Sequence, residues 1–301
     1  MAETVTRGAG FGLGLALLGT LVLTPDAMLM RLSGMDGFQM SAWRGFLMGG
    51  VMLLAWWLTS RDRLGDLRQI TTTAGVVIVI CQFFNSMLFC LGIAAAPAAI
   101  VLIGIAAVPV FSALLSWGIS REPTSALTWG AIAAVIVGLL IAVSGKGAQL
   151  NATAVIGVLF GLGVAFVLAL NFTILRAHQR LPILLLIGVG AVLAGINGLI
   201  IAGPANMVTG APWAMVTTGA VVLPLSFYLL SLSARYTHAA NVSLIMLMET
   251  VLGPLWVWLA VGEVPTGRMI VGGASVLMAL AIYLILARRR AFRAASMPAP
   301  P

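Results

Sequence analysis

The chain has 301 residues, of which 61% are hydrophobic and only 8% are charged. Soluble domains contain about 25% charged residues, so this composition excludes a water-soluble globular fold and makes hydrocarbon the expected surroundings. The formal net charge of +8 would in a soluble protein indicate nucleic-acid binding. Here the basic residues lie between long apolar runs, which favours a lipid bilayer as partner and no nucleic acid.

Ten apolar stretches follow one another along the chain, each near the length of about 20 residues that a membrane-spanning helix needs. They cover residues 9–30, 39–59, 71–92, 96–119, 125–144, 153–175, 183–203, 213–233, 239–261 and 267–287. The connections between them are too short for a soluble domain. The sequence therefore predicts an all-α integral membrane protein with ten transmembrane helices.

The basic residues predict how these helices are oriented, because cytoplasmic loops carry an excess of Lys and Arg. With the N-terminus inside, twelve basic residues fall in cytoplasmic segments, whereas Arg31, Lys146 and Arg268 fall outside. Arg44 lies within the second predicted helix. We therefore predict that the N- and C-termini are both cytoplasmic.

Two segments about 142 residues apart resemble each other, which indicates an internal repeat. The turn Glu122–Thr124 precedes the fifth helix, and the turn Glu263–Thr266 precedes the tenth; Asp26 in the first helix aligns with Asn171 in the sixth. The predicted units are residues 1–148, residues 149–290 and a disordered cytoplasmic tail at 291–301. Five helices are an odd number, so the second unit enters the membrane from the opposite side, as in the inverted repeats of many alternating-access transporters. Chance similarity between apolar segments is the alternative.

Charged residues inside a membrane are costly and indicate function, and three are found here. Glu249 lies near the centre of the ninth helix, where it could take up a coupled proton, hold a substrate amine, or bond to a neighbouring helix as a neutral carboxyl group. Asp26 in the first helix and Arg44 in the second lie at matching depths. An ion pair between them is predicted, with gating or carboxylate binding as the alternative role.

Uncharged polar and aromatic residues on three helices are candidates for lining a substrate cavity. They are Gln82, Phe83, Asn85 and Ser86 in the third helix, Asn171 in the sixth, and Phe227 and Tyr228 in the eighth. Gln82 and Ser86 are four residues apart and share a helix face. Hydrogen bonding between helices is the alternative role for the polar members. Pro109 and Pro254 lie mid-helix at corresponding places and predict kinks that could act as hinges.

The segment Ala94–Val143 and its second copy, which ends at Glu263–Thr266, resemble the drug/metabolite transporter superfamily in its EamA-like ten-helix branch. Arg44 within "SAWRGF" is similar to that family's helix-2 arginine, whereas Glu249 ahead of Gly253-Pro254 departs from the first copy. The resemblance implies a carrier in the bacterial cytoplasmic (inner) membrane, closest to exporters of amino acids including aromatic ones. It also implies a cavity formed mainly by the third, fourth, eighth and ninth helices.

The sequence thus favours a secondary transporter of small organic metabolites, with a multidrug or other metabolite carrier, for efflux or uptake, as the alternative. A membrane-embedded enzyme or a channel is less favoured, because the sequence has no metal-ligand cluster, cofactor motif or filter signature. We expect no enzymatic activity, no metal and no cofactor. We also expect a monomer or weak dimer, with coupling to protons left open.

Overall fold

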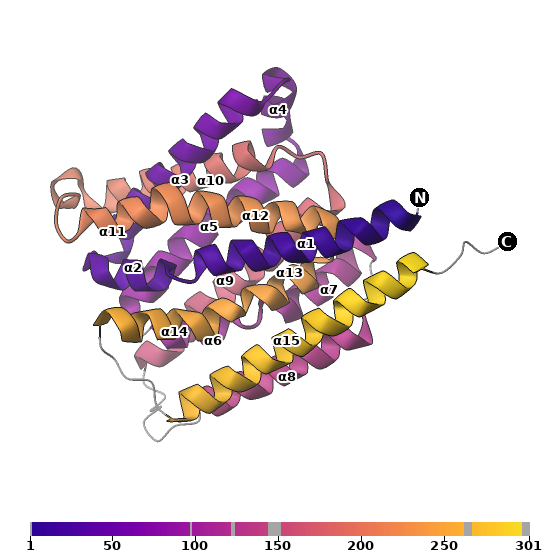
Figure 1. The fold of residues 1–301 in the computed structure, drawn as a ribbon. Coiled ribbons are helices and arrows are strands. Elements are labelled where there is room, and N and C mark those ends of the chain that lie inside the picture. Colours follow the sequence, from indigo (N-terminus) through magenta and orange to yellow (C-terminus); the bar gives the residue numbers. More distant parts are fainter. Residues whose placement is uncertain (1, 97, 122–123, 144–151, 262–266, 297–301) are drawn as a thin grey trace.

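The computed structural model describes residues 2–96, 98–121, 124–143, 152–261 and 267–296. In these ranges the chain is helical without any strand, and most of the long helices run along one bundle (Figure 1). Seven of the described helices are long and apolar enough to cross a membrane. The prediction of a multi-pass helical membrane protein is therefore confirmed.

The first part of the chain forms eight helices. They are α1 (Ala2–Leu23), α2 (Asp26–Ser33), α3 (Gly37–Thr59), α4 (Arg63–Ile70), α5 (Thr73–Ala95), α6 (Ala98–Ile105), α7 (Val108–Ser120) and α8 (Ala126–Val143). Side chains fix several of the starting points. Asp36 accepts hydrogen bonds from the backbone N–H groups of Phe38 and Gln39 at the start of α3, and Thr72 accepts one from Gly75 at the start of α5.

The second part forms seven α-helices and two short helical turns. They are α9 (Ala152–Ala177), α10 (Ile183–Ala202), η1 (Pro204–Asn206), α11 (Pro212–Thr217), the π-helical turn η2 (Thr218–Val222), α12 (Leu223–Tyr236), α13 (Ala239–Met246), α14 (Met248–Val261) and α15 (Gly267–Ser296). The expected disordered tail began at residue 291, but α15 is helical to Ser296. Three of the six residues from 291 to 296 are alanine, which favours helix. Residues 297–301 of that tail lie outside the described residues.

Three of the predicted continuous helices are interrupted. Thr24 and Pro25 separate α1 from α2, Ala106 and Ala107 separate α6 from α7, and Leu247 separates α13 from α14. Pro109 follows the second interruption within the first turn of α7, where a missing backbone N–H costs nothing. Pro254, in contrast, lies inside α14, seven residues after the interruption at Leu247. The two latter interruptions are themselves about 141 residues apart, close to the repeat distance.

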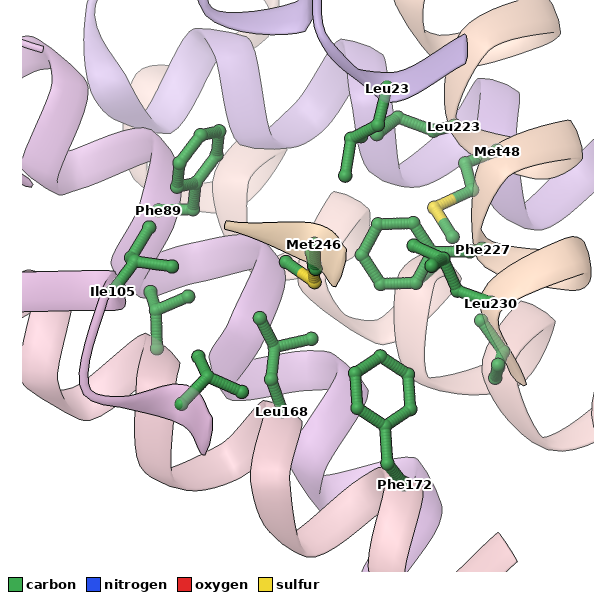
Figure 2. Close-up of a cluster of buried hydrophobic side chains, with 14 of the residues drawn as sticks. Leu23, Met48, Phe89, Ile105, Leu168, Phe172, Leu223, Phe227, Leu230 and Met246 are labelled. Carbon is green, nitrogen blue, oxygen red and sulfur yellow. The ribbon is translucent and has the colours of Figure 1, made fainter. Parts of the chain in front are cut away.

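The helices pack in pairs around one main apolar core. The most extensive contacts join α3 to α10, α8 to α15, α1 to α12, and α5 to α9. The main core gathers side chains from α1, α5, α9, α12 and α13, part of which Figure 2 shows. A second, smaller cluster holds α8 and α15 together around Tyr283, and Figure 1 shows this pair along one edge of the bundle.

Glycines allow the closest of these contacts. A Cβ atom added at Gly45 of α3 would lie 2.6 Å from the carbonyl oxygen of Ala191 and would overlap the backbone of Gly195, both on α10. A Cβ atom added at Gly161 of α9 would lie 2.8 Å from the Cα of Gly104 on α6. These small residues therefore serve helix contacts within the chain.

Candidate functional site

A cavity lies between the helices, next to all three of the helix interruptions. Its walls come from α1, α2, α3, α5, α6, α9, α12, α13 and α14. Its polar lining is Asp26, Arg44, Gln82, Asn85, Ser86 and Glu249, and its apolar lining is Leu23, Met48, Phe89, Ile105, Val164, Leu168, Leu223, Phe227 and Met246. A few charged and amide groups among apolar side chains are the lining expected of a site for a small organic molecule.

An ion pair between Asp26 and Arg44 forms one part of the cavity wall. The Arg44 guanidinium donates from Nη1 to Asp26 Oδ1 and from Nη2 to Oδ2, each over 2.8 Å. Asp26 is 1% exposed and Arg44 is 5% exposed, so both charges are buried. Asp26 is also the first residue of α2, where a negative charge meets the positive end of the helix dipole.

Two further side chains fix this pair. The Thr218 hydroxyl of the π-helical turn η2 donates a hydrogen bond to Asp26 Oδ1. The Arg44 guanidinium carbon lies 5.3 Å from the centroid of the Phe89 ring, within range of a cation–π contact. A hydrogen bond also joins the interruption between α1 and α2 to α14, because Trp256 Nε1 donates to Thr24 Oγ1 over 2.9 Å. The predicted partners Asp26 and Arg44 thus meet in a well-supported bidentate pair.

Glu249 brings a third charged group to the cavity. It is the second residue of α14, directly after the interruption at Leu247, and it is only 3% exposed. Its carboxyl group makes no hydrogen bond and no ion pair with any residue in the described ranges. A buried carboxyl group without a partner is energetically costly, so a ligand would stabilise this part of the site most.

The amide and hydroxyl groups of α5 line the same cavity. Gln82 Nε2 donates to Ser86 Oγ over 3.3 Å, in keeping with the shared helix face expected for this spacing. The Oε1 atom of Gln82 is buried and has no hydrogen-bond partner. Asn85 is 7% exposed and lies one turn away on the same wall.

The remaining candidates do not line the cavity. Phe83 is half-buried and packs edge-on against the exposed Phe84, with ring centroids 5.2 Å apart. Tyr228 is exposed on the outer face of α12, although its neighbour Phe227 faces the cavity. Successive helical residues point about 100° apart, so one of two adjacent aromatic residues turns outward. Asn171 is buried in α9 beside the site, and its Oδ1 atom has no partner.

Several lining residues were not among the sequence candidates. Phe89 lies seven residues after Gln82 and three after Ser86, which places it on the same helix face. Helical spacing alone could therefore have identified it. Met48 and Met246 carry no such signal, because they resemble any apolar residue of a membrane helix. Thr218 does not line the cavity but contacts Asp26 from the π-helical turn η2, and the local sequence does not predict such a turn.

Comparisons with known proteins agree with a transporter bundle around such a cavity. The family model described as "EamA-like transporter family" matches residues 10–144. The predicted resemblance is confirmed over that part of the chain, and it indicates a membrane transporter of small substrates.

A solved structure described only as "Crystal structure of protein" is similar in fold, with a TM-score of 0.73 and 18% sequence identity. The alignment covers 92% of this chain and 97% of that one. No curated protein matches the chain. At this identity the likeness establishes the fold over nearly the whole chain, and it leaves the substrate to be argued from the site.

Proposed function

We propose that this protein is a secondary transporter that moves small organic metabolites across the bacterial cytoplasmic (inner) membrane by alternating access. One observation carries the proposal: a cavity among the membrane-spanning helices is lined by the Asp26–Arg44 ion pair, by the Glu249 carboxyl group and by apolar side chains. Within the described residues, that carboxyl group has no hydrogen-bond partner. Polar groups at this depth are expensive unless function requires them. The match of residues 10–144 to a transporter family supports the same conclusion.

Alternating access would use two inverted five-helix units, residues 1–148 and 149–290. The helix pairing supports this arrangement, because α1 packs on α12 while α9 packs on α5, and α3 packs on α10 while α8 packs on α15. In the first two pairs, the first helix of one unit contacts the third helix of the other, and in the last two pairs the second helices and the fifth helices of the two units contact each other. Rocking of one unit against the other would then open the cavity to each side in turn.

Matched arginines give independent support for the repeat. Arg31, at the end of α2, donates from Nη2 to the carbonyl oxygen of Ala96 just after α5, over 2.8 Å. Its repeat equivalent Arg176, in the last turn of α9, donates from Nη1 to the carbonyl oxygen of Arg235 in the last turn of α12, over 2.9 Å. Each arginine therefore binds the C-terminal end of the third predicted helix of its own unit, a matched role at equivalent positions.

Amino acids, including aromatic ones, are the substrates we propose to test first, and export is the direction that the family resemblance implies. Phe89 and Phe227 offer apolar rings to a side chain, and Glu249 could bind an amine or exchange a coupled proton. The test is uptake of a panel of labelled amino acids into proteoliposomes, with and without a pH gradient. Movement of at least one of them, absent from protein-free vesicles, is the expected result.

A carrier of drugs or other metabolites, for efflux or uptake, is the second candidate. The side chains of Met48 and Met246 in the cavity wall favour it, because methionine adapts to ligands of different shapes. The same vesicles would be tested with lipophilic dyes. Transport of dyes but of no amino acid would select this alternative, and movement of neither would contradict the transporter proposal.

A further inference from the structure

We infer that the cavity recognises the ammonium group of its substrate through the carboxyl group of Glu249, while Arg44 stays with Asp26. The carboxylate of an amino acid would then add no affinity, and organic amines with an apolar body would be the preferred class. This inference rests on the proposed transport function and deepens it, because it names the chemical group by which the substrate is selected.

The first step is the charge balance of the cavity. Three charged side chains line it, and Arg44 is the single cation among the residues that form its wall. Both terminal nitrogens of Arg44 are already bonded to the two oxygens of Asp26, and its face lies over Phe89. This pair is neutral as a unit, so Glu249 is left as the charge that a ligand has to match.

The second step is the supply of hydrogen-bond groups. An ammonium group donates up to three hydrogen bonds and accepts none, so it needs oxygen acceptors. The Glu249 carboxyl group and the buried Oε1 atom of Gln82 both lack a hydrogen-bond partner within the described part of the chain. A substrate carboxylate would need donors and a cation instead. Arg44 Nη1 and Nη2 donate to Asp26, and Gln82 Nε2 donates to Ser86. The Asn85 amide and the Ser86 hydroxyl are the donors left on this wall, and neither carries a charge.

The third step is the shape and chemistry of the remaining wall. Figure 2 shows Phe89, Leu168, Phe227 and Met246 in one cluster of buried apolar side chains, and all four line the cavity. These side chains offer only apolar surface, which suits a hydrocarbon or aromatic body and penalises a second charged group. An arylalkylamine matches both parts of the site, whereas the matching zwitterion adds a carboxylate for which the cavity wall has no cation outside the Arg44–Asp26 pair.

The test compares three ligands that differ only in the carboxylate. They are an aromatic amino acid, its methyl ester and the amine that lacks the carboxyl group, each competing with a labelled substrate in proteoliposomes that hold the wild-type chain. The ester and the amine should compete at least as well as the amino acid. If the amino acid binds tighter than its ester by about tenfold or more, the carboxylate is recognised and the inference fails.

Variants then identify the recognising group. Glu249→Gln should weaken competition by the amine and by the ester by about tenfold or more. Asp62→Asn is the matched control, because Asp62 is an exposed carboxylate at the start of α4 and asparagine caps a helix equally well. Equal loss in both variants, or no loss in Glu249→Gln, would overturn the role of Glu249.

The wild-type ligand series needs no variant to fold, and it separates the two proposals. If none of the three ligands competes while another solute is still transported, the inference alone fails. If no solute of the wider panel moves at all, the proposed function fails with it.

Discussion

Arg44 and Asp26 are mutually dependent, because each neutralises the other in a place that water does not reach. Removing one partner of a buried ion pair costs about 3–5 kcal/mol, since the other charge stays buried without compensation. We therefore expect Arg44→Gln and Asp26→Asn each to lower the melting temperature of the purified protein markedly. The double variant should be less destabilised than the two single effects combined, because it leaves no unpaired charge. Thermal unfolding in one detergent gives all three values, and strictly additive losses would contradict a coupled pair.

Substitution of Glu249, in contrast, should impair transport without lowering thermal stability. Its carboxyl group has no partner among the described residues, so Glu249→Gln removes a buried ionisable group without breaking a bond. We expect unchanged or higher thermal stability but a loss of transport of about tenfold or more, because the ligand or proton loses its acceptor. Transport into proteoliposomes under an imposed pH gradient measures this loss. Unchanged transport with an unchanged response to the gradient would exclude a functional role for Glu249.

The sequence reached part of this site through simple physical rules. The cost of charge in a membrane identified Asp26, Arg44 and Glu249, and all three line the cavity. Helical spacing brought Gln82 and Ser86 together. Phe83 and Tyr228 do not line the cavity. An aromatic ring packs equally well against lipid and against the core, so hydrophobicity alone does not predict which way the side chain points.

At the scale of helices, the interruption in the ninth predicted helix does not fall at its proline. The interruption between α13 and α14 falls at Leu247, ahead of Pro254, and places Glu249 in the first turn of α14. Proline marks where a helix can bend, whereas the surrounding packing decides where it does. This is why the sequence predicted a kink near the correct place in the ninth helix yet not at the residue where the structure has its break.

The contact between α3 and α10 yields a prediction at this scale. Gly45→Ala should destabilise the protein by about 1–3 kcal/mol, because its methyl group meets the backbone of Gly195, which has no rotamer to change. Gly50→Ala lies on the same helix with no atom within 4 Å of the added Cβ, and it is the matched control. Apparent melting temperatures of the two variants test this, and equal shifts would contradict close packing at Gly45.

For the whole molecule, hydropathy predicted the helical membrane class, and seven described spans bear this out. Ten helices arranged as five plus five stay a prediction, because the length and composition of a helix carry no information on which side it enters. The described part of the chain does place the start of α1 and the end of α15 at the same end of the bundle (Figure 1). That placement agrees with an even number of crossings and with both termini on one side.

Cysteine labelling can test the inverted arrangement directly. The native Cys81 and Cys90 are buried and free, so the background from a membrane-impermeant maleimide should be low. Ala94 and Tyr236 are equivalent in the repeat and both exposed, yet the inverted repeat assigns Ala94 to the outside and Tyr236 to the cytoplasm. We expect Ala94→Cys to react in intact cells, and Tyr236→Cys to react only after the membrane is opened.

Two further positions fix the reference for that experiment. Val208→Cys lies in the connection before α11, which the positive-inside rule assigns to the outside, and Arg61→Cys lies in the basic connection before α4, which it assigns to the cytoplasm. Both positions are exposed, so their labelling reports the side of the membrane and not burial. If Ala94→Cys and Tyr236→Cys then react from the same side, the two units are not inverted. The alternating-access model proposed above relies on two inverted units, so it would be contradicted.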